Sequence, residues 1–476
     1  MDKSRTSLMN RTKIIATIGP ACANVKMLQK LIDHGVVCFR INLSHGSDKE
    51  KEEYFDLVRS LQTQHGLRPT ILADLSGPKI RVSNLENPIN LSKGHKIKIS
   101  NEEVATGVIP VSKEVRFKKV NPGAQILIDD GRTSLKVVEH VSDQTLLCVA
   151  LEDGIVENRK GVNFPEIDLN VPALTQQDEK DLLLSLEKGA DWIALSFVRS
   201  PSDYTLISTK IKKAGYQTPV IAKIEKWEAV QNLQEIIQSF DAVMVARGDL
   251  GVEIPIAKVP LVQMDVIEKA HQAGKPVIVA TQILDSMVER PVPTRAEVSD
   301  IANSILDGAD ALMVTGETAI GKHPKKVIKV LGGVIRETES AIKYHSKFEI
   351  SEDNTTNTAR AISHAACSVS SDQGINILVT MTHSGSTARM AARYRPSARI
   401  VAMTPFKAIC RQLEIVWGVS PILVEEYESA DEIPEIASLA LKEKGLLNVG
   451  EKFVITGGVP VGIPGTTNYL SVLKIS

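Results

Sequence analysis

Two apolar stretches of this chain each end in charged side chains that together could bind a metal ion and a phosphate. The run Val243–Ala246 stops at the charged segment Arg247–Asp249, and an earlier run ends in Lys223–Glu225. Buried parallel strands end in this way when their carboxyl ends carry chemistry. If the two strands are neighbours, they offer one lysine and two carboxylates to a single pocket. A carboxylate pair that holds Mg²⁺ beside a cation suits chemistry on a phosphorylated acid.

Short apolar runs alternate with segments of helical periodicity and predict the elements that position these residues. Helices are expected over Val25–His34 and Ala229–Gln238, and glycines follow several of the expected helices. The expected strands are Lys13–Ile18, Val36–Ile41, Thr70–Ala73, Trp192–Phe197, Val220–Ile224, Ala242–Ala246, Pro276–Ala280 and Ala311–Val314. Eight such β/α units predict a TIM barrel, for which about 250 residues is typical.

The helical period is interrupted once, from about Val82 to Asn170. Alternating residues replace it, and Asp130-Gly131 gives a hairpin turn, so a small β domain inserted after the third strand is expected. Helical periodicity resumes near Thr175, where Thr175 and Asp178 form a capping-box-like start. The barrel would then consist of residues 1–81 and 171–345, with the inserted domain at 82–170.

The pattern starts again in residues 346–476, which we expect to form a separate open α/β domain. A helix at Thr358–Ser370 precedes a strand, a hydroxyl-rich loop and a helix that runs through Arg395. The acidic stretch Glu349–Asp353 is a linker or a solvated loop. The expected strands are Ile377–Met381, Arg399–Thr404, Pro421–Val424, Lys452–Thr456 and Tyr469–Leu473.

The composition excludes some classes of protein. The 476 residues are 43% hydrophobic and 24% charged, as in globular proteins of about two to four domains. A net charge of −1 argues against nucleic-acid binding through a broad basic face. The five scattered cysteines read as reduced thiols of a cytoplasmic protein. The amino terminus has no signal-peptide core, and no apolar run is long enough to span a bilayer.

The expected barrel rim, at the carboxyl ends of the strands, is too rich in charge to serve only fold maintenance. Its residues are Gly19, Arg40, Asn42, Ser44, Asp74, Lys79, Arg81, Ser196, Lys223, Glu225, Arg247, Asp249, Thr281, Thr315 and Glu317.

For each key residue a functional role stands beside a structural one. Lys223 is catalytic or forms a buried ion pair with Glu225 or Asp249, and these two carboxylates bind Mg²⁺ or act as its salt-bridge partners. Arg40 binds a phosphoryl group or is a structural guanidinium. Thr281 contacts substrate or caps a helix.

The chain resembles the pyruvate kinase family over essentially its full length. No single phrase suffices, but the joint order is specific, and the insertion falls where the family carries its lid domain. The matching phrases are Thr12–Pro20, Arg40–Gly46, Asp74–Arg81, Lys160–Asn163, Ala222–Glu225, Met244–Gly251, Ala280–Gln282, Pro293–Glu297 and Gly316–Thr318.

The resemblance implies transfer of the phosphoryl group of phosphoenolpyruvate to ADP, which gives pyruvate and ATP. It implies that Arg40 holds the phosphoryl group and that Lys223 stabilises its charge and that of the enolate. Glu225 and Asp249 would hold Mg²⁺ or Mn²⁺. Gly248 and Thr281 would contact the substrate carboxylate, together with Asp249 at the metal. The nucleotide would be bound by Asn42, Ser44, His45, Arg81 and Lys160, of which His45 alone would read as a loop residue.

One departure from the family concerns the monovalent ion. Many members have threonine and glutamate where this chain has Leu75 and Lys79, and those members need K⁺. A lysine ammonium can occupy the position of the ion, so the chain resembles the K⁺-independent branch. Asn42, Ser44 and Asp74, the other residues of the ion position, are retained, so K⁺ dependence stays an open question.

The carboxyl-terminal domain resembles the family's effector domain. Its loop joins a strand to a helix amino end, where hydroxyl and N–H groups favour a phosphate, and Gly462–Thr467 could close over it. A phosphorylated sugar or nucleotide is therefore expected there, although an ordinary capped turn is the alternative. The family also suggests a homotetramer. The expected effector residues are Thr382, Ser384, Gly385, Ser386 and Thr387.

Two rival functions share features of this pattern. A metal-dependent aldolase or lyase acting on pyruvate enolate can share the barrel and the metal carboxylates, but it would not need the lid or the nucleotide contacts. A catalytically silent regulatory protein would show degenerate site residues, whereas the key side chains are all present here.

Overall fold

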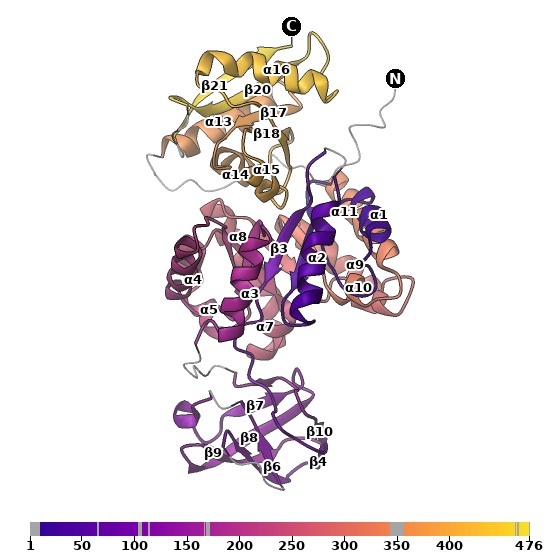
Figure 1. The fold of residues 1–476 in the computed structure, drawn as a ribbon, viewed down its shortest axis with the longest axis vertical. Helices are drawn as coiled ribbons and strands as arrows, with labels where there is room; N and C mark the ends of the chain where they lie inside the picture. The colour runs from indigo at the N-terminus through magenta and orange to yellow at the C-terminus, as the bar shows by residue number, and fades with distance from the viewer. Residues whose placement is uncertain are drawn as a thin grey trace.

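The computed structural model describes residues 10–475 except 64–65, 103–106, 113–114, 166, 168–171, 343–356, 462 and 464–465. It has three parts in a row, with a barrel in the middle (Figure 1). None of the described helices is long and apolar enough to cross a membrane. The expected linker at Glu349–Asp353 lies outside the described residues.

The central part is the closed parallel barrel that the sequence predicts. Its strands are buried on both faces because helices cover the outside and side chains fill the inside. Around the barrel the order is β1, β16, β15, β14, β13, β12, β3 and β2. The strands are β1 (Lys13–Thr17), β2 (Val36–Asn42), β3 (Thr70–Asp74), β12 (Trp192–Leu195), β13 (Val220–Ile224), β14 (Ala242–Ala246), β15 (Val277–Ala280) and β16 (Ala311–Val314).

The covering helices bury their apolar stripe against the strands. Gly274 and Gly308 end α8 and α9 with φ of 67° and 108°, a conformation that costs glycine little. The helices are α1 (Val25–Asp33), α2 (Asp48–Ser60), α3 (Gln176–Glu187), α4 (Pro201–Lys213), α5 (Trp227–Gln231), α6 (Leu233–Ser239), α7 (Arg247–Glu253), α8 (Val259–Ala273), α9 (Arg295–Asp307), α10 (Gly316–Ala319) and α11 (Pro324–Ala341), with short 3₁₀ turns η2 (Ile256–Lys258) and η3 (Asp285–Val288).

The inserted β domain, here called the lid, follows β3 and returns to the barrel at α3. It holds a six-stranded sheet of order β11-β7-β8-β9-β5-β6 and a two-stranded sheet of β10 and β4 around its own core. Asp130-Gly131 makes the turn between β7 and β8, as predicted. The elements are β4 (Ile89–Leu91), β5 (Lys96–Ser100), β6 (Val108–Pro110), η1 (Phe117–Lys119), β7 (Gln125–Ile128), β8 (Thr133–Ser142), β9 (Thr145–Ala150), β10 (Gly154–Val156) and β11 (Val162–Asn163).

The C-terminal domain has a five-stranded sheet of order β19-β18-β17-β20-β21, in which β21 is antiparallel. Its elements are α13 (Thr358–Asp372), β17 (Ile377–Met381), α14 (Ser386–Arg393), β18 (Arg399–Thr404), α15 (Lys407–Leu413), β19 (Val419–Leu423), η4 (Ala430–Glu432), α16 (Ile433–Glu443), β20 (Lys452–Gly458) and β21 (Thr467–Lys474).

Several expected elements differ from the structure at their ends, such as the strand expected at Trp192–Phe197, which ends at Leu195. The helix expected at Ala229–Gln238 is two helices, because Asn232 leaves helical geometry and its amide donates to the Arg199 carbonyl at 2.8 Å. The helix expected to run through Arg395 ends at Arg393, because Arg395 has a φ of 45° and turns into the barrel. Strand β19 starts two residues before Pro421, which an edge strand tolerates.

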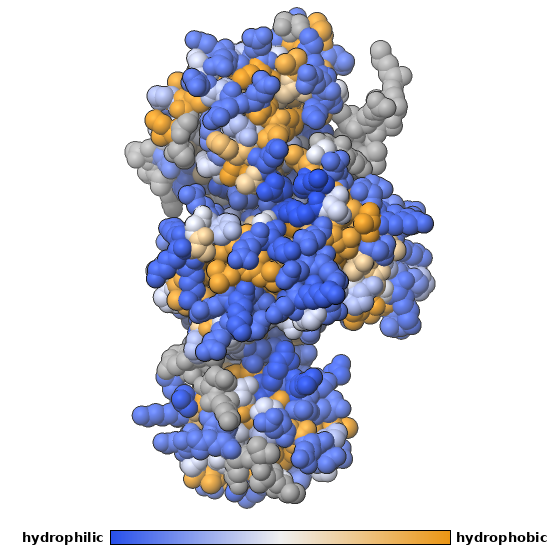
Figure 2. Space-filling view, in the orientation of Figure 1, coloured by the Kyte–Doolittle hydropathy of each residue, from blue (hydrophilic) through white to orange (hydrophobic). Residues whose placement is uncertain are grey.

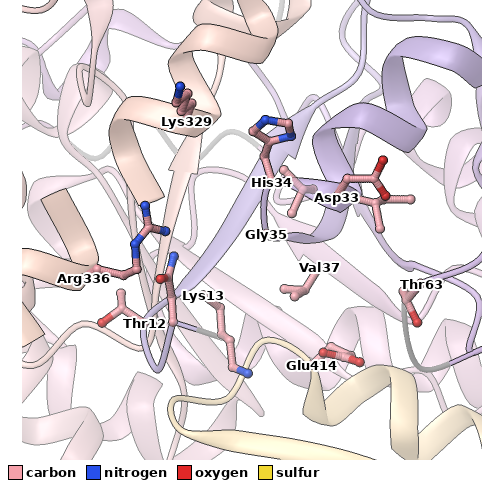
Figure 3. Close-up of a pocket in the computed structure, with 13 residues that line it drawn as sticks. Thr12, Lys13, Asp33, His34, Gly35, Val37, Thr63, Lys329, Arg336 and Glu414 are labelled. Atoms are coloured by element: carbon pink, nitrogen blue, oxygen red, sulfur yellow. The ribbon is translucent and has the colours of Figure 1, made fainter. Parts of the chain in front are cut away.

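The C-terminal domain docks on the amino ends of the barrel strands. The Arg395 guanidinium donates to Asp310 Oδ1 at 3.0 Å and lies over the Trp417 ring. The Lys13 ammonium donates to the Val419 carbonyl at 2.6 Å. A cavity of about 280 Å³ remains beside this junction, with Lys13 reaching it from the barrel and Glu414 from the C-terminal domain (Figure 3). The lid and the rim lie at the other end of the barrel.

Candidate active site

The carboxyl ends of β2, β3, β13 and β14 bring the expected rim residues together. The register pairs Asn42 with Asp74, and it pairs Ile224, one residue before Glu225, with Val245. Because β13 and β14 are neighbours, as the sequence predicts, Glu225 and the start of α7 lie side by side at this end of the barrel.

Lys223 is the centre of this site. Its ammonium lies 2.9 Å from Glu225 Oε1, 3.1 Å from Asp74 Oδ1 and 2.8 Å from Ser196 Oγ. The side chain is only 11% exposed. Burial alone would lower the pKa of Lys223, but the carboxylates of Asp74 and Glu225 outweigh it and raise the pKa above its ordinary value. The ammonium therefore stays charged wherever the protein is folded near neutral pH.

Arg40 lies beside Lys223 because both cations share one carboxylate. Arg40 Nε donates to Asp74 Oδ2 at 2.7 Å, and its Nη1 donates to Thr17 Oγ1 at 3.2 Å. Burial would raise the pKa of Asp74, but Lys223 and Arg40 more than compensate and lower it. An ionised Asp74 thus holds two positive charges side by side at the rim, an arrangement that suits an anionic substrate.

Glu225 and Asp249 are the expected metal ligands. Glu225 Oε2 accepts from the Phe197 N–H at 2.9 Å, whereas Oε1 lies near Lys223 without the geometry of a hydrogen bond. Burial raises the pKa of Glu225 against the effect of Lys223, and the charge of Asp249 adds to the rise. A divalent cation would offset the repulsion between these two carboxylates and stabilise their charged forms. Within the part of the chain that the structure describes, no group of three or more His, Cys, Asp or Glu residues surrounds them. Two carboxylates suit Mg²⁺, which keeps water and substrate oxygens as its other ligands.

Thr281 has a strained backbone at the end of β15. Its φ is 66°, unusual for a β-branched residue, and such strain persists where the surroundings enforce it. The Thr281 hydroxyl accepts from the Gly248 N–H at 2.8 Å, so it caps α7 from the neighbouring strand. The structure thus shows the capping role of Thr281, and its contact with substrate stays a prediction. The Arg247 guanidinium fixes the loop through the Thr281 and Gln282 carbonyls and through Asp300.

The expected nucleotide residues come from the end of β2 and from the segments that lead to and from the lid. Burial lowers the pKa of His45, and the charges of Arg81, Arg40 and Lys79 lower it further, which places these cations around it. Ser44 N donates to Asn42 Oδ1 at 3.2 Å. Lys160 belongs to the lid, where hydrogen bonds to Asp129 and Glu157 raise its pKa.

Lys79 does not reach the Asp74 carboxylate in this structure. Its ammonium lies 3.3 Å from Asp249 Oδ1, and a Cβ on Gly161 would come within 3.1 Å of Lys79 Cε. Leu75 is buried, and its carbonyl accepts from Ser196 Oγ at 2.7 Å. The lysine thus adds a positive charge at the rim beside the expected metal ligand.

The expected effector loop joins β17 to α14 as the sequence predicts. The Gly385 N–H donates to Thr382 Oγ1 at 2.9 Å, Ser384 Oγ donates to Ser386 Oγ at 3.0 Å, and Thr387 shares a hydrogen bond with Thr467 at 2.8 Å. Gly385 needs its φ of 79° for this turn. Of the expected closing loop Gly462–Thr467, residues 462, 464 and 465 lie outside the described residues.

One residue at the base of the lid has a larger role than the sequence indicated. Asp178 forms the predicted capping box with Thr175, and its Oδ1 also accepts from the Gly77 N–H at 3.0 Å. A single fully buried carboxylate therefore fastens both the outgoing and the returning connection of the lid. Only the capping spacing was visible in the sequence.

The fold and the rim define a lidded (β/α)₈ barrel enzyme that acts on anionic substrates. The sequence model of the pyruvate kinase barrel domain matches residues 9–328, and that of the pyruvate kinase alpha/beta domain matches residues 360–473.

Similar proteins bear the same family name. The pyruvate kinase of Thermotoga maritima is 42% identical, covering 98% of this chain and 100% of that protein, and that of Clostridium acetobutylicum is 38% identical, covering 98% and 99%. The crystal structure of a pyruvate kinase from Cryptosporidium parvum superposes with a TM-score of 0.91 at 32% identity, covering 98% of this chain and 96% of that one. The chain belongs to the pyruvate kinase family. Its activity is phosphoryl transfer from phosphoenolpyruvate to ADP, with pyruvate as a product.

Proposed function

We propose that Lys223 is the main electrostatic catalyst of this phosphoryl transfer. The observation that carries the proposal is the buried ammonium of Lys223 between Asp74, Glu225 and Ser196. Phosphoryl transfer needs little covalent chemistry from the protein, so positioned charge supplies most of the catalysis. Lys223 would stabilise the charge of the phosphoryl group and then of the enolate that departs from it.

The substrate would lie between Arg40 and the strained loop at Thr281. Arg40 would bind the phosphoryl group with the N–H groups that Asp74 and Thr17 leave free. The Gly248 N–H and the Thr281 hydroxyl would orient the substrate carboxylate, with Thr281 near the carbon that is protonated. The left-handed backbone of Thr281 supports this role, because backbone strain concentrates at functional sites.

Glu225 and Asp249 would hold one Mg²⁺ or Mn²⁺, the ions that the family generally uses. When bound, the ion supplies positive charge to the phosphoryl and enolate oxygens. The free coordination capacity of Glu225 Oε1 supports this assignment. We expect Lys79 to give up its contact with Asp249 Oδ1 as the ion binds.

The lid would deliver the nucleotide. Arg81 and Lys160 would contact ADP from the lid side, and Asn42, Ser44 and His45 would contact it from the barrel. A lid excludes water, which otherwise competes with ADP for the phosphoryl group.

We also propose the boundaries of the three domains. The barrel would consist of residues 1–81 and 171–345, the lid of residues 82–170 and the C-terminal domain of residues 346–476.

Lys79 would replace K⁺ in this enzyme. Its ammonium lies at the rim near Asp249 and within electrostatic range of His45, which supports a role as a fixed monovalent charge. Since Lys79 does not contact Asp74, its ammonium would not occupy the place of K⁺ beside that carboxylate. It would act through its positive charge at a longer distance.

The C-terminal loop would bind a phosphorylated sugar or nucleotide activator. Hydroxyl groups and the amino end of α14 support an anion there. Adding sugar bisphosphates, sugar monophosphates and AMP in turn should shift the phosphoenolpyruvate saturation curve for one class. An unchanged curve in every case would leave the loop as an ordinary capped turn.

We also propose a cytoplasmic homotetramer. Exposed apolar side chains on the barrel support burial against further copies. Apolar areas are visible among the polar surface of the barrel in Figure 2. The exposed residues are Ile256, Leu261, Met264, Val292 and Ile320. Light scattering on protein that elutes from a size-exclusion column measures the molar mass of the assembly. The mass of a monomer or a dimer would contradict a tetramer.

The decisive experiment measures pyruvate formation from phosphoenolpyruvate, ADP and Mg²⁺ in matched buffers with and without K⁺. Equal activity in both supports the kinase and the Lys79 assignment together. Activity only with K⁺ keeps the kinase and removes the Lys79 assignment. Absence of activity in both buffers, even with phosphorylated activators, would favour a catalytically silent regulatory protein or an aldolase or lyase that acts on pyruvate enolate.

A further inference from the structure

A partly buried contact at the base of the lid joins it to the helix that carries the expected metal ligand. Asn163 Nδ2, in β11 of the lid, donates to Glu253 Oε1 in α7 at 2.7 Å. The Lys226 ammonium donates to the same oxygen at 2.7 Å. Glu253 is only 1% exposed, so this carboxylate depends on its two donors.

The barrel end of this contact lies one helical turn from the rim. Glu253 follows Asp249 by four residues in α7, so both side chains lie on the same face of the helix. Lys79, which leaves the barrel towards the lid, contacts Asp249 on that face. In this structure both contacts hold the lid base against α7. Since Lys79 is expected to leave Asp249 when the ion binds, the contact between Asn163 and Glu253 is the one that would remain.

The lid end of the contact belongs to the segment that carries the nucleotide residues. Backbone hydrogen bonds join Val82 N to the Lys160 carbonyl at 2.8 Å and Val162 N to the Ile80 carbonyl at 2.9 Å. The Arg81 guanidinium also donates to the Arg159 carbonyl at 3.0 Å. A shift of Asn163 would therefore move Arg81 and Lys160 together.

We propose that Glu253 and Asn163 form an anchor that sets the position of the lid and so the affinity for ADP. Both are positioning residues, because they act through Arg81, Lys160 and α7 and not by contact with substrate. The inference rests on the proposed binding of the nucleotide by Arg81 and Lys160.

The test exchanges the two partners. Asn163→Asp places two carboxylates within hydrogen-bond distance of each other, and like charges there should displace the lid. We expect the KM for ADP to rise about tenfold, while the KM for phosphoenolpyruvate and kcat change less than about threefold. The double variant Asn163→Asp with Glu253→Gln restores one carboxylate and one amide to the contact. It should recover most of the ADP affinity.

The control is Asn90→Asp, which adds the same charge at an exposed position of β4 in the lid. It should leave all constants unchanged. Unchanged KM for ADP in Asn163→Asp would overturn the anchor, as would a double variant no better than the single one. A lower melting temperature without a kinetic change would assign the contact to stability alone. Loss of activity in the unmodified protein would instead count against the proposed function.

Discussion

Replacing Lys223 by methionine should test both its catalytic role and its structural role, because the substitution keeps an unbranched side chain, one atom shorter, and removes the ammonium. Each of its two carboxylate contacts near 3 Å carries a gross attraction of roughly 5 kcal/mol at an effective dielectric constant of about 20. Desolvation offsets most of this. Removing one partner of a buried ion pair costs about 3–5 kcal/mol, since the other charge stays buried.

The stability of the variant should also acquire a steeper pH dependence. In the unmodified protein the lowered pKa of Asp74 contributes stability that is present above its unfolded value and lost only on acidification. Without Lys223, only Arg40 would still oppose the effect of burial on Asp74, so the pKa of Asp74 would rise, and burial would raise the pKa of Glu225 further. The native state would then bind more protons than the unfolded state. Stability would fall as pH rises from the unfolded pKa of the carboxyl groups, about 4, towards their raised folded values, by up to ~1.4 kcal/mol per pH unit for each retained proton.

Two assays measure these effects. Urea unfolding can follow tryptophan fluorescence, since Trp192 and Trp227, two of the three tryptophans, lie in the barrel. Pyruvate formation at saturating substrate should fall about 10²–10³-fold, as on loss of one preorganised charge. Lys188→Met, at an exposed ion pair on the barrel, should leave both readouts unchanged. A variant with full kcat, or one whose stability does not fall with rising pH, would refute the reasoning.

Three other outcomes test separate parts of the site. Lys79→Glu should make activity depend on K⁺ by about tenfold or more, ~1.4 kcal/mol of barrier, and equal rates in matched buffers with and without K⁺ would contradict the role of Lys79. Asp178→Ala leaves the Gly77 N–H without its acceptor and should lower the free energy of unfolding by about 2 kcal/mol in urea titrations, whereas Glu179→Gln beside it should not. Excess chelator should abolish pyruvate formation and added Mg²⁺ or Mn²⁺ should restore it; full activity in chelator would exclude Glu225 and Asp249 as ligands of an essential ion.

The barrel could be predicted from the sequence because its strands follow the strongest local signals. Val220–Ile224, Ala242–Ala246 and Ala311–Val314 agree with the predicted strands residue for residue. The last two are short apolar runs bounded by polar residues, and the first is apolar except for Lys223. Burial on both faces leaves little ambiguity. The rim followed from these ends, since parallel neighbours place their carboxyl termini together.

What the sequence could not supply are contacts between distant segments. The break at Asn232 depends on the Arg199 carbonyl, which no local period records. The position of Lys79 depends on Gly161, which lies in the returning part of the lid. The anchor between Asn163 and Glu253 spans ninety residues of sequence, and each residue alone reads as an ordinary polar position.

Closure of the barrel between β1 and β16 determines the order in which the domains fold during synthesis of the chain. Lys13 pairs with Ala311, so the first strand waits for its partner while 298 further residues are made. At about 5–20 residues per second this is roughly 15–60 s with an unpaired strand edge. The lid is complete by Asn163 and forms its sheets from its own strands, so we expect it to fold first. Limited proteolysis of ribosome-bound chains that end before β16 should leave the lid uncut while the incomplete barrel is cleaved. Cleavage of the lid in these chains would refute this order.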